Sequence, residues 1–164
     1  GSVTVNAGAG QDTINLTLGA AGKADFIVNQ GHSTLSAYDS IKGALVSKVT
    51  FDFDPSGTAT AVQANATAQA VAGYTSAELT YTINTGMLTF VGTKSSSLTV
   101  DQIASIATNL VGTDKAVIFE YMDAGSATTD SYVYYNGATE DSLVKLVGLD
   151  SGSITAASGI ITVA

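Results

Sequence analysis

The residue with the most specific candidate chemistry is Asp12, which ends a turn of small residues near the start of the chain. Residues 7–12 read Ala-Gly-Ala-Gly-Gln-Asp, and the apolar Ile14 follows. Gly8 and Gly10 allow the backbone to turn tightly and bring its carbonyl oxygens close together. A carboxylate beside such carbonyls is a hard oxygen donor of the kind that Ca²⁺ prefers. The turn therefore predicts a calcium site with Asp12 as a ligand and with Gly8 and Gly10 at the carbonyl positions.

One such turn is only part of a calcium site, because Ca²⁺ takes about six to eight oxygen ligands. Residues 19–25 form a degenerate second turn, in which one residue too many separates Gly22 from Asp25. We expect Asp25 to be the acid that completes the site with Asp12. The alternative for Asp12 is an ordinary Asx turn between two strands.

The other candidate sites are weaker. Residues 52–57 read Asp-Phe-Asp-Pro-Ser-Gly, like the opening of an EF-hand loop, but the twelfth position is Gln63 instead of a bidentate Glu, so we favour a turn with exposed acids. Asp123, Asp130, Glu140 and Asp141 are expected to be solubilising loop charges, and a weakly bound cation is the alternative for them. His32 is the only imidazole, there is no Cys, and no Gly-x-Ser-x-Gly motif occurs. The sequence therefore predicts neither a zinc site nor an enzyme.

Acidic side chains outnumber basic ones and limit the classes of partner. The 164-residue chain has 14 acidic residues against six basic ones, a net charge of -8. Nucleic acids and anionic lipids are bound through Lys and Arg, so neither is an expected partner, and cations are favoured instead. No apolar run approaches the about 20 residues that a membrane span needs. The chain opens with Gly-Ser and has no signal peptide, so we expect a fragment of a larger protein.

Hydrophobic alternation predicts a mainly β protein, either β-sandwich-like or a β-rich α+β domain. The expected strands cover residues 3–5, 14–18, 25–29, 49–53, 117–121, 131–135, 140–149, 153–155 and 159–164, with a hairpin at 79–91. A helix at 100–111 is predicted because Thr99 and Gln102 form a capping box. Residues 58–72, rich in Ala, Thr and Gln, are ambiguous, and Ala favours a helix there. The tyrosines of 132–135 are a candidate aromatic face for sugar or protein contact.

Two segments resemble a known family. Residues 7–14 match the calcium-binding nonapeptide Gly-Gly-x-Gly-x-Asp-x-apolar-x, with Ala7 in place of the first Gly, and so resemble one repeat of the RTX family of type I secreted proteins. Residues 130–149 are similar to the carboxyl-terminal domain that follows such repeats, with Tyr134 or Tyr135 where the family has Phe. The Cys-free, acidic composition, rich in Ala, Thr and Gly, is similar to that of S-layer proteins exported by this route.

The resemblance implies the carboxyl-terminal, non-catalytic structural module of an S-layer or adhesin-like protein, secreted to the bacterial cell surface. Residues 1–30 would be a remnant of the RTX-like repeats and 31–164 a compact β-rich domain, unless 1–164 is a single domain. Ca²⁺ is the implied cofactor. The type I secretion apparatus is the implied partner, together with self-association into a surface lattice or a cell-surface polysaccharide. The alternatives are the tail of a secreted RTX hydrolase and a carbohydrate-binding or adhesin β-sandwich.

Overall fold

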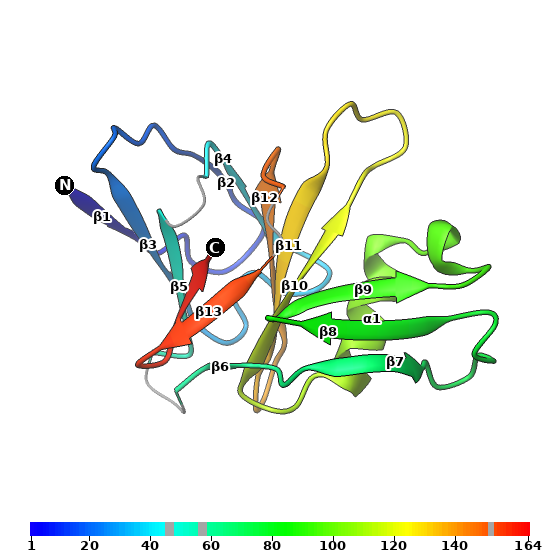
Figure 1. Cartoon of the computed structure of the whole chain (residues 1–164). Helices are drawn as coiled ribbons and strands as arrows, with labels where there is room; N and C mark the ends of the chain where they lie inside the picture. The colour runs from blue at the N-terminus through cyan, green and yellow to red at the C-terminus, as the bar shows by residue number, and fades with distance from the viewer. Residues whose placement is uncertain (45–47, 56–58, 151–152) are drawn as a thin grey trace.

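The computed structural model describes residues 1–44, 48–55, 59–150 and 153–164. Strands dominate this part of the chain, and they form a five-stranded and a nine-stranded sheet accompanied by one α-helix (Figure 1). The predicted β-rich fold class with one helix is therefore confirmed. Both sheets mix parallel and antiparallel neighbours.

The five-stranded sheet has the order β1 (Ser2–Val5), β3 (Lys23–Val28), β5 (Val49–Phe53), β14 (Ile160–Val163) and β13 (Ile154–Ala157). The nine-stranded sheet runs β2 (Thr13–Asn15), β4 (Asp39–Lys42), β12 (Ser142–Val147), β11 (Asp130–Asn136), β10 (Lys115–Tyr121), β9 (Met87–Val91), β8 (Thr80–Asn84) and β7 (Ala66–Ala70). Its ninth strand, β6 (Ala61–Val62), pairs with β10.

Strands β1 to β5 alternate between the two sheets and form a unit that we call the N-terminal coil. β1, β3 and β5 pair in parallel in one sheet, while β2 and β4 pair in parallel in the other. The register places Val5 beside Phe26 and Phe26 beside Phe51. The rings of Phe26 and Phe51 stack with their centroids 5.5 Å apart. Each turn of the coil thus adds one strand to each sheet. The first 30 residues therefore contribute strands to both sheets, and the rest of the chain contributes the other strands.

The three central strands, β10 to β12, are buried on both faces. Alternate side chains of these strands, such as Ile118 and Val133, enter the core between the two sheets. Their neighbours, such as Phe119 and Tyr132, enter a second core that includes residues of the helix. Because side chains alternate across a strand, one tyrosine-rich strand can supply both cores.

The helix α1 (Val100–Leu110) and its capping box confirm the prediction for residues 100–111. The backbone N–H of Gln102 donates to Thr99 Oγ1 at 3.3 Å, and that of Thr99 donates to Gln102 Oε1 at 2.9 Å. Two orphan donors of the first turn are thereby satisfied. Its buried face, which includes Ile103 and Ala107, packs in the same core as Ile83 and Leu88 of the β8–β9 hairpin.

The hairpin predicted at 79–91 and the strand preferred at 140–149 are also confirmed, as β8–β9 and β12. The helix favoured for residues 58–72 is wrong: the described part of this segment contains β6 and β7 instead, while Thr58 lies outside the described residues. β7 is held by antiparallel pairing with β8, which outweighs the modest helix propensity of alanine.

Candidate functional site

The turn before β2 has the backbone geometry that its glycines predict. Gly8 has a φ of 90° and Gly10 a φ of 112°, in the left-handed region that glycine adopts without strain. Asn6 Oδ1 accepts a hydrogen bond of 3.1 Å from the backbone N–H of Gly8 and closes the first half of the turn. The chain then enters β2 at Thr13, directly after Asp12.

Asp12 lies beside Asp39, the corresponding acid of the next coil. Thr13 pairs with Ser40 in the parallel ladder, so the two aspartates occupy equivalent positions just before that pair. The backbone N–H of Asp12 donates to Asp39 Oδ1 at 2.9 Å, and its carbonyl accepts from the Ser40 N–H at 2.9 Å. Asp39 is 5% exposed, and burial raises the pKa of its carboxyl, opposed by the hydrogen bond from Asp12.

Asp25 lies in a different part of the fold from Asp12. It belongs to β3, in the five-stranded sheet, and its Oδ1 accepts a hydrogen bond of 2.6 Å from Thr50 Oγ1 of β5. The structure therefore brings Asp39 to Asp12, and not Asp25. The signal for Asp39 is the repeated triplet Asp-x-Ile, at residues 12–14 and again at 39–41.

The acids of the described residues do not gather into a complete metal site. Among these residues, no group of three or more His, Cys, Asp or Glu side chains is placed to hold a metal ion. At 52–57, Asp54 Oδ2 accepts from Gln30 Nε2 at 2.7 Å, and Gln63 Oε1 accepts from the Gly112 N–H at 2.8 Å. Ser56 and Gly57 of this segment lie outside the described residues. In the part of the chain that the structure describes, the acid that lies beside Asp12 is Asp39.

The apolar side chains that point into the N-terminal coil are only partly buried on its first two strands, β1 and β2. β1 and β2 are the outermost strands of their sheets at this end of the coil. Val3 is 45% exposed although its neighbour in the ladder, Ala24, is fully buried. Further inward positions, Val5 and Ile14, are also only partly buried. We call this surface the open end of the coil.

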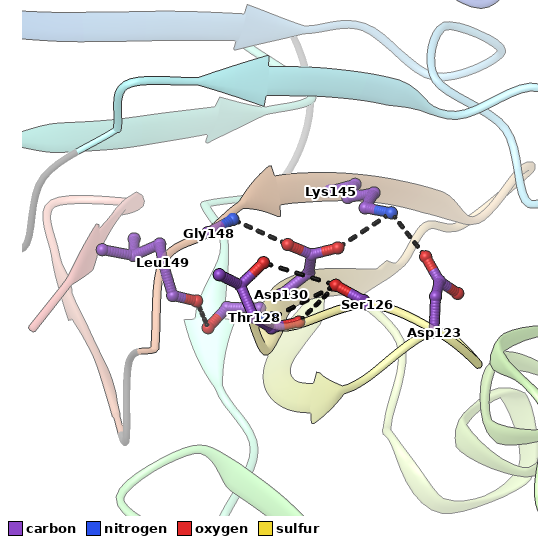
Figure 2. A network of polar contacts seen from close by, with 8 residues as sticks. Asp123, Ser126, Thr128, Asp130, Lys145, Gly148 and Leu149 are labelled. Atoms are coloured by element: carbon purple, nitrogen blue, oxygen red, sulfur yellow. Dashed lines mark hydrogen bonds and ion pairs between the residues drawn. The ribbon is translucent and has the colours of Figure 1, made fainter.

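A second polar cluster joins the β10–β11 loop to β12 (Figure 2). Lys145 Nζ lies 2.9 Å from Asp130 Oδ2 and 3.0 Å from Asp123 Oδ2. It also lies 5.5 Å from the centroid of the Tyr132 ring. Asp130 Oδ1 accepts a 2.6 Å bond from the Gly148 N–H. Burial lowers the pKa of Lys145, but the hydrogen bonds to both aspartates outweigh burial and raise it.

This cluster corrects one prediction about the loop charges. Asp130 is 4% exposed and serves as a buried anchor, so its prediction as a solubilising loop charge is wrong. Asp123, with a side chain 53% exposed, does lie at the surface. The charged side chains of Asp123, Asp130 and Lys145 pair with one another and fix the loop against β12. We therefore assign this cluster a structural role.

The candidate aromatic face is not available to a ligand. Tyr132, Tyr134 and Tyr135 are all 0% exposed, because β11 is covered on both faces. Their rings pack against phenylalanines of both cores: Tyr132 on Phe119 and Tyr135 on Phe53. The tyrosines that were a candidate face for sugar or protein contact are therefore core residues.

The hydroxyl of Ser33, which follows His32, is hydrogen-bonded to two backbone groups. Ser33 Oγ donates to the carbonyl of Leu143 at 2.5 Å and accepts from the Asp39 N–H at 2.8 Å. Ser33 is fully buried, so this hydroxyl holds the loop before β4 against β12.

Within the described residues, no helix is both long enough and apolar enough to cross a membrane. Comparisons with protein-family models, with curated proteins and with solved structures find no match to this chain.

Proposed function

We propose that the chain is a non-catalytic structural module from the carboxyl-terminal end of a type I secreted, calcium-binding bacterial cell-surface protein of the S-layer or adhesin kind. The observation that supports this most is the N-terminal coil, in which parallel strands alternate between two sheets. Stacked coils of this kind are how calcium-binding nonapeptide repeats bury their apolar positions. The module would end such a stack and support secretion and surface assembly.

The open end of the coil has the properties that a stacking surface needs. β1 and β2 each have a parallel neighbour on one side, so a preceding coil would extend both sheets at once. It would also cover Val3, Val5 and Ile14, which are inward positions without full cover. Repeat units of this type gain stability from the interface with each neighbour.

Calcium would bind at this open end of the coil. The turn at 7–12 would contribute the Asp12 carboxylate and backbone carbonyls. In the chain alone, water would complete a weak coordination shell, and the turn of a stacked coil would replace that water. With a net charge of -8, the chain is self-repelling when calcium is scarce. Calcium outside the cell would then favour the folded, stacked state by mass action.

The test is thermal unfolding of this chain in EGTA, in Mg²⁺ and in about 10 mM Ca²⁺, for the wild type and for Asp12→Asn. Extracellular modules bind calcium with dissociation constants of about 1 mM. In Ca²⁺ the free energy of unfolding of the wild type should therefore rise by about 1.4 kcal/mol, which raises its Tm by about 3–5 °C. Asp12→Asn should lose most of this gain. Asp25→Asn is the matched control, because Asp25 lies in the other sheet, and it should keep the gain.

A wild type whose Tm is the same in all three solutions would overturn the calcium part of the proposal. The stacking part has a separate test, in which two calcium-binding nonapeptide coils are fused before Ser2. The fusion should unfold in one calcium-dependent transition at a higher temperature than the chain alone. Two independent transitions would show that the open end accepts no coil.

A further inference from the structure

An amine and a carboxyl group are held against each other by two neighbouring strands. Lys145 of β12 is the ladder partner of Tyr132 in β11, and Asp130 lies two residues before Tyr132, so both side chains project from the same face of the sheet. Lys145 Nζ lies 2.9 Å from Asp130 Oδ2. Because the strands hold the two groups at this distance, much of the entropic barrier to a reaction between them is already overcome in the folded state.

The Asp130 carboxyl is placed like an acyl group that an amine can attack. Figure 2 shows it between two nitrogen atoms: the Gly148 N–H donates to Oδ1 at 2.6 Å, and Lys145 Nζ contacts Oδ2. A backbone N–H on Oδ1 polarises the carboxyl and would stabilise the negative charge that this oxygen gains during attack, as the donors of an oxyanion hole do. Oδ2 is then the leaving oxygen.

Asp123 supplies the third group that amide formation needs. Its Oδ2 lies 3.0 Å from Lys145 Nζ. A carboxylate at this distance can take a proton from the amine and pass it to the leaving oxygen, as general acid–base catalysts do. The Asp123 side chain is 53% exposed, so its replacement leaves no buried charge behind and tests this role directly.

Aromatic rings cover the Lys145–Asp130 pair and remove most of its water. The Tyr132 ring has its centroid 5.5 Å from Lys145 Nζ and stacks on the ring of Phe119. The Lys145 side chain is 16% exposed and that of Asp130 is 6% exposed. Two buried charges lose hydration energy that their attraction does not fully restore, and conversion to a neutral amide removes this cost. The surroundings therefore favour an amide over the ion pair.

We propose that Lys145 and Asp130 form an intramolecular isopeptide bond, which cross-links β12 to the start of β11. The Lys145 ammonium gives one proton to Asp130 Oδ2, and the neutral Nζ attacks Asp130 Cγ. As the Nζ–Cγ bond forms, Asp123 carries a second proton from Nζ to Oδ2. The Cγ–Oδ2 bond then breaks and releases water. One ammonium and one carboxylate thus become one amide and one water, with nothing oxidised or reduced.

The bond should form slowly, after the strands have paired. Burial lowers the pKa of Lys145, but its hydrogen bonds to Asp130 and Asp123 outweigh burial and raise it, so the attacking neutral amine is scarce. One reaction in the lifetime of each molecule is sufficient, because an amide inside a folded protein is not readily hydrolysed. The cross-link needs neither calcium nor a stacked coil, so it stands apart from the proposed function.

Intact-mass spectrometry of the purified chain, before and after several days of incubation, tests the cross-link. The wild type should fall below its sequence mass by about 18 Da, the mass of one water. Trypsin cleaves after lysine, so it should fail to cleave between Lys145 and Leu146 while it still cleaves after Lys115. Asp123→Ala should slow the mass loss by about a hundredfold.

Two substitutions at the reacting residues separate the cross-link from other losses of water. Lys145→Arg keeps the positive charge but has no amine to acylate, so it should retain its full mass. Asp130→Asn should still cross-link, but with release of ammonia, a loss of about 17 Da. Lys94→Arg, at an exposed lysine, is the matched control and should lose water like the wild type.

A wild type that keeps its sequence mass after incubation would overturn the inference. So would a loss of water that Lys145→Arg shows equally, since the water would then come from another acid, such as an aspartate that forms a succinimide. Normal tryptic cleavage after Lys145 in the lighter species would contradict it in the same way.

Discussion

Glu120 and Asp150 form a pair of carboxyl groups near the end of β10. Burial, which is the largest cause, and the hydrogen bond and charge of Asp150 together raise the pKa of Glu120 to about 7. The folded state therefore holds a proton on Glu120 at pH values where the unfolded chain, with a pKa of 4.5, has lost it. By linkage, this group favours folding below about pH 4.5, and its contribution is lost as the pH rises to about 7.

Glu120→Gln should remove this pH dependence. Compared with the wild type, the variant should be more stable at pH 8 by about 1 kcal/mol, after allowance for solvent screening, and the difference should vanish near pH 5. The measurement is the free energy of unfolding in urea at several pH values. Glu140→Gln, an exposed acid, is the control. Parallel pH curves for wild type and Glu120→Gln would show that the carboxyl pair is not coupled to folding.

Lys145 is the residue whose loss should cost the most stability among the charged groups. Its removal leaves Asp130 buried without a counter-charge, which is a larger penalty than the loss of a surface pair. We expect Lys145→Met to lower the free energy of unfolding by about 3 kcal/mol. Asp123→Ala, which removes the exposed partner only, should cost less than about 1 kcal/mol. Equal losses in urea unfolding would contradict the assignment of Asp130 as the buried anchor.

At the scale of elements, the β8–β9 turn connects the nine-stranded sheet to β13. Gly86 has a φ of 78°, and a Cβ added there would lie 2.4 Å from Ile154 Cγ1 and 2.9 Å from Val62 Cγ1. The Thr85 carbonyl accepts from the Ile154 N–H at 3.1 Å. The turn therefore needs glycine both for its conformation and for close contact with two other strands.

Gly86→Ala should destabilise the fold by about 3 kcal/mol, because backbone strain and overpacking act together. Gly73→Ala is the matched control: Gly73 has a φ of 87°, but a Cβ there would meet nothing within 4 Å. It should cost about 1 kcal/mol, from strain alone. Thermal unfolding of both variants gives the comparison, and similar Tm values would show that the contact with Ile154 yields easily.

Local signals decided which elements could be predicted. α1 was predictable because Thr99 and Gln102 supply the hydrogen bonds that cap its first turn. The β8–β9 hairpin was predictable because a turn separates two segments in which apolar and polar residues alternate. β7 was not predictable, because the sequence Ala-Thr-Ala-Gln-Ala has no strong preference of its own. Only the neighbouring edge of β8, with its backbone donors and acceptors, makes it a strand.

At the scale of the whole molecule, the two sheet ends differ in character. One end is the open end of the N-terminal coil, where inward apolar positions such as Val3 are exposed. The other is the nearly uncharged β7 edge beside α1. The open end of the coil and the β7 edge are therefore separate surfaces of the molecule.

The sequence by itself determined the fold class, most of the strands, the helix with its cap and the tight glycine turn, because alternation, capping and glycine conformation are local properties. It also pointed to Asp12 as an acid next to turn carbonyls. Tertiary structure alone decided that Asp39 is the neighbour of Asp12, that Asp130 is buried against Lys145 and that all three tyrosines of β11 are core. These facts depend on which strands pair and in what register, and such long-range pairing is set by the packing of the whole chain.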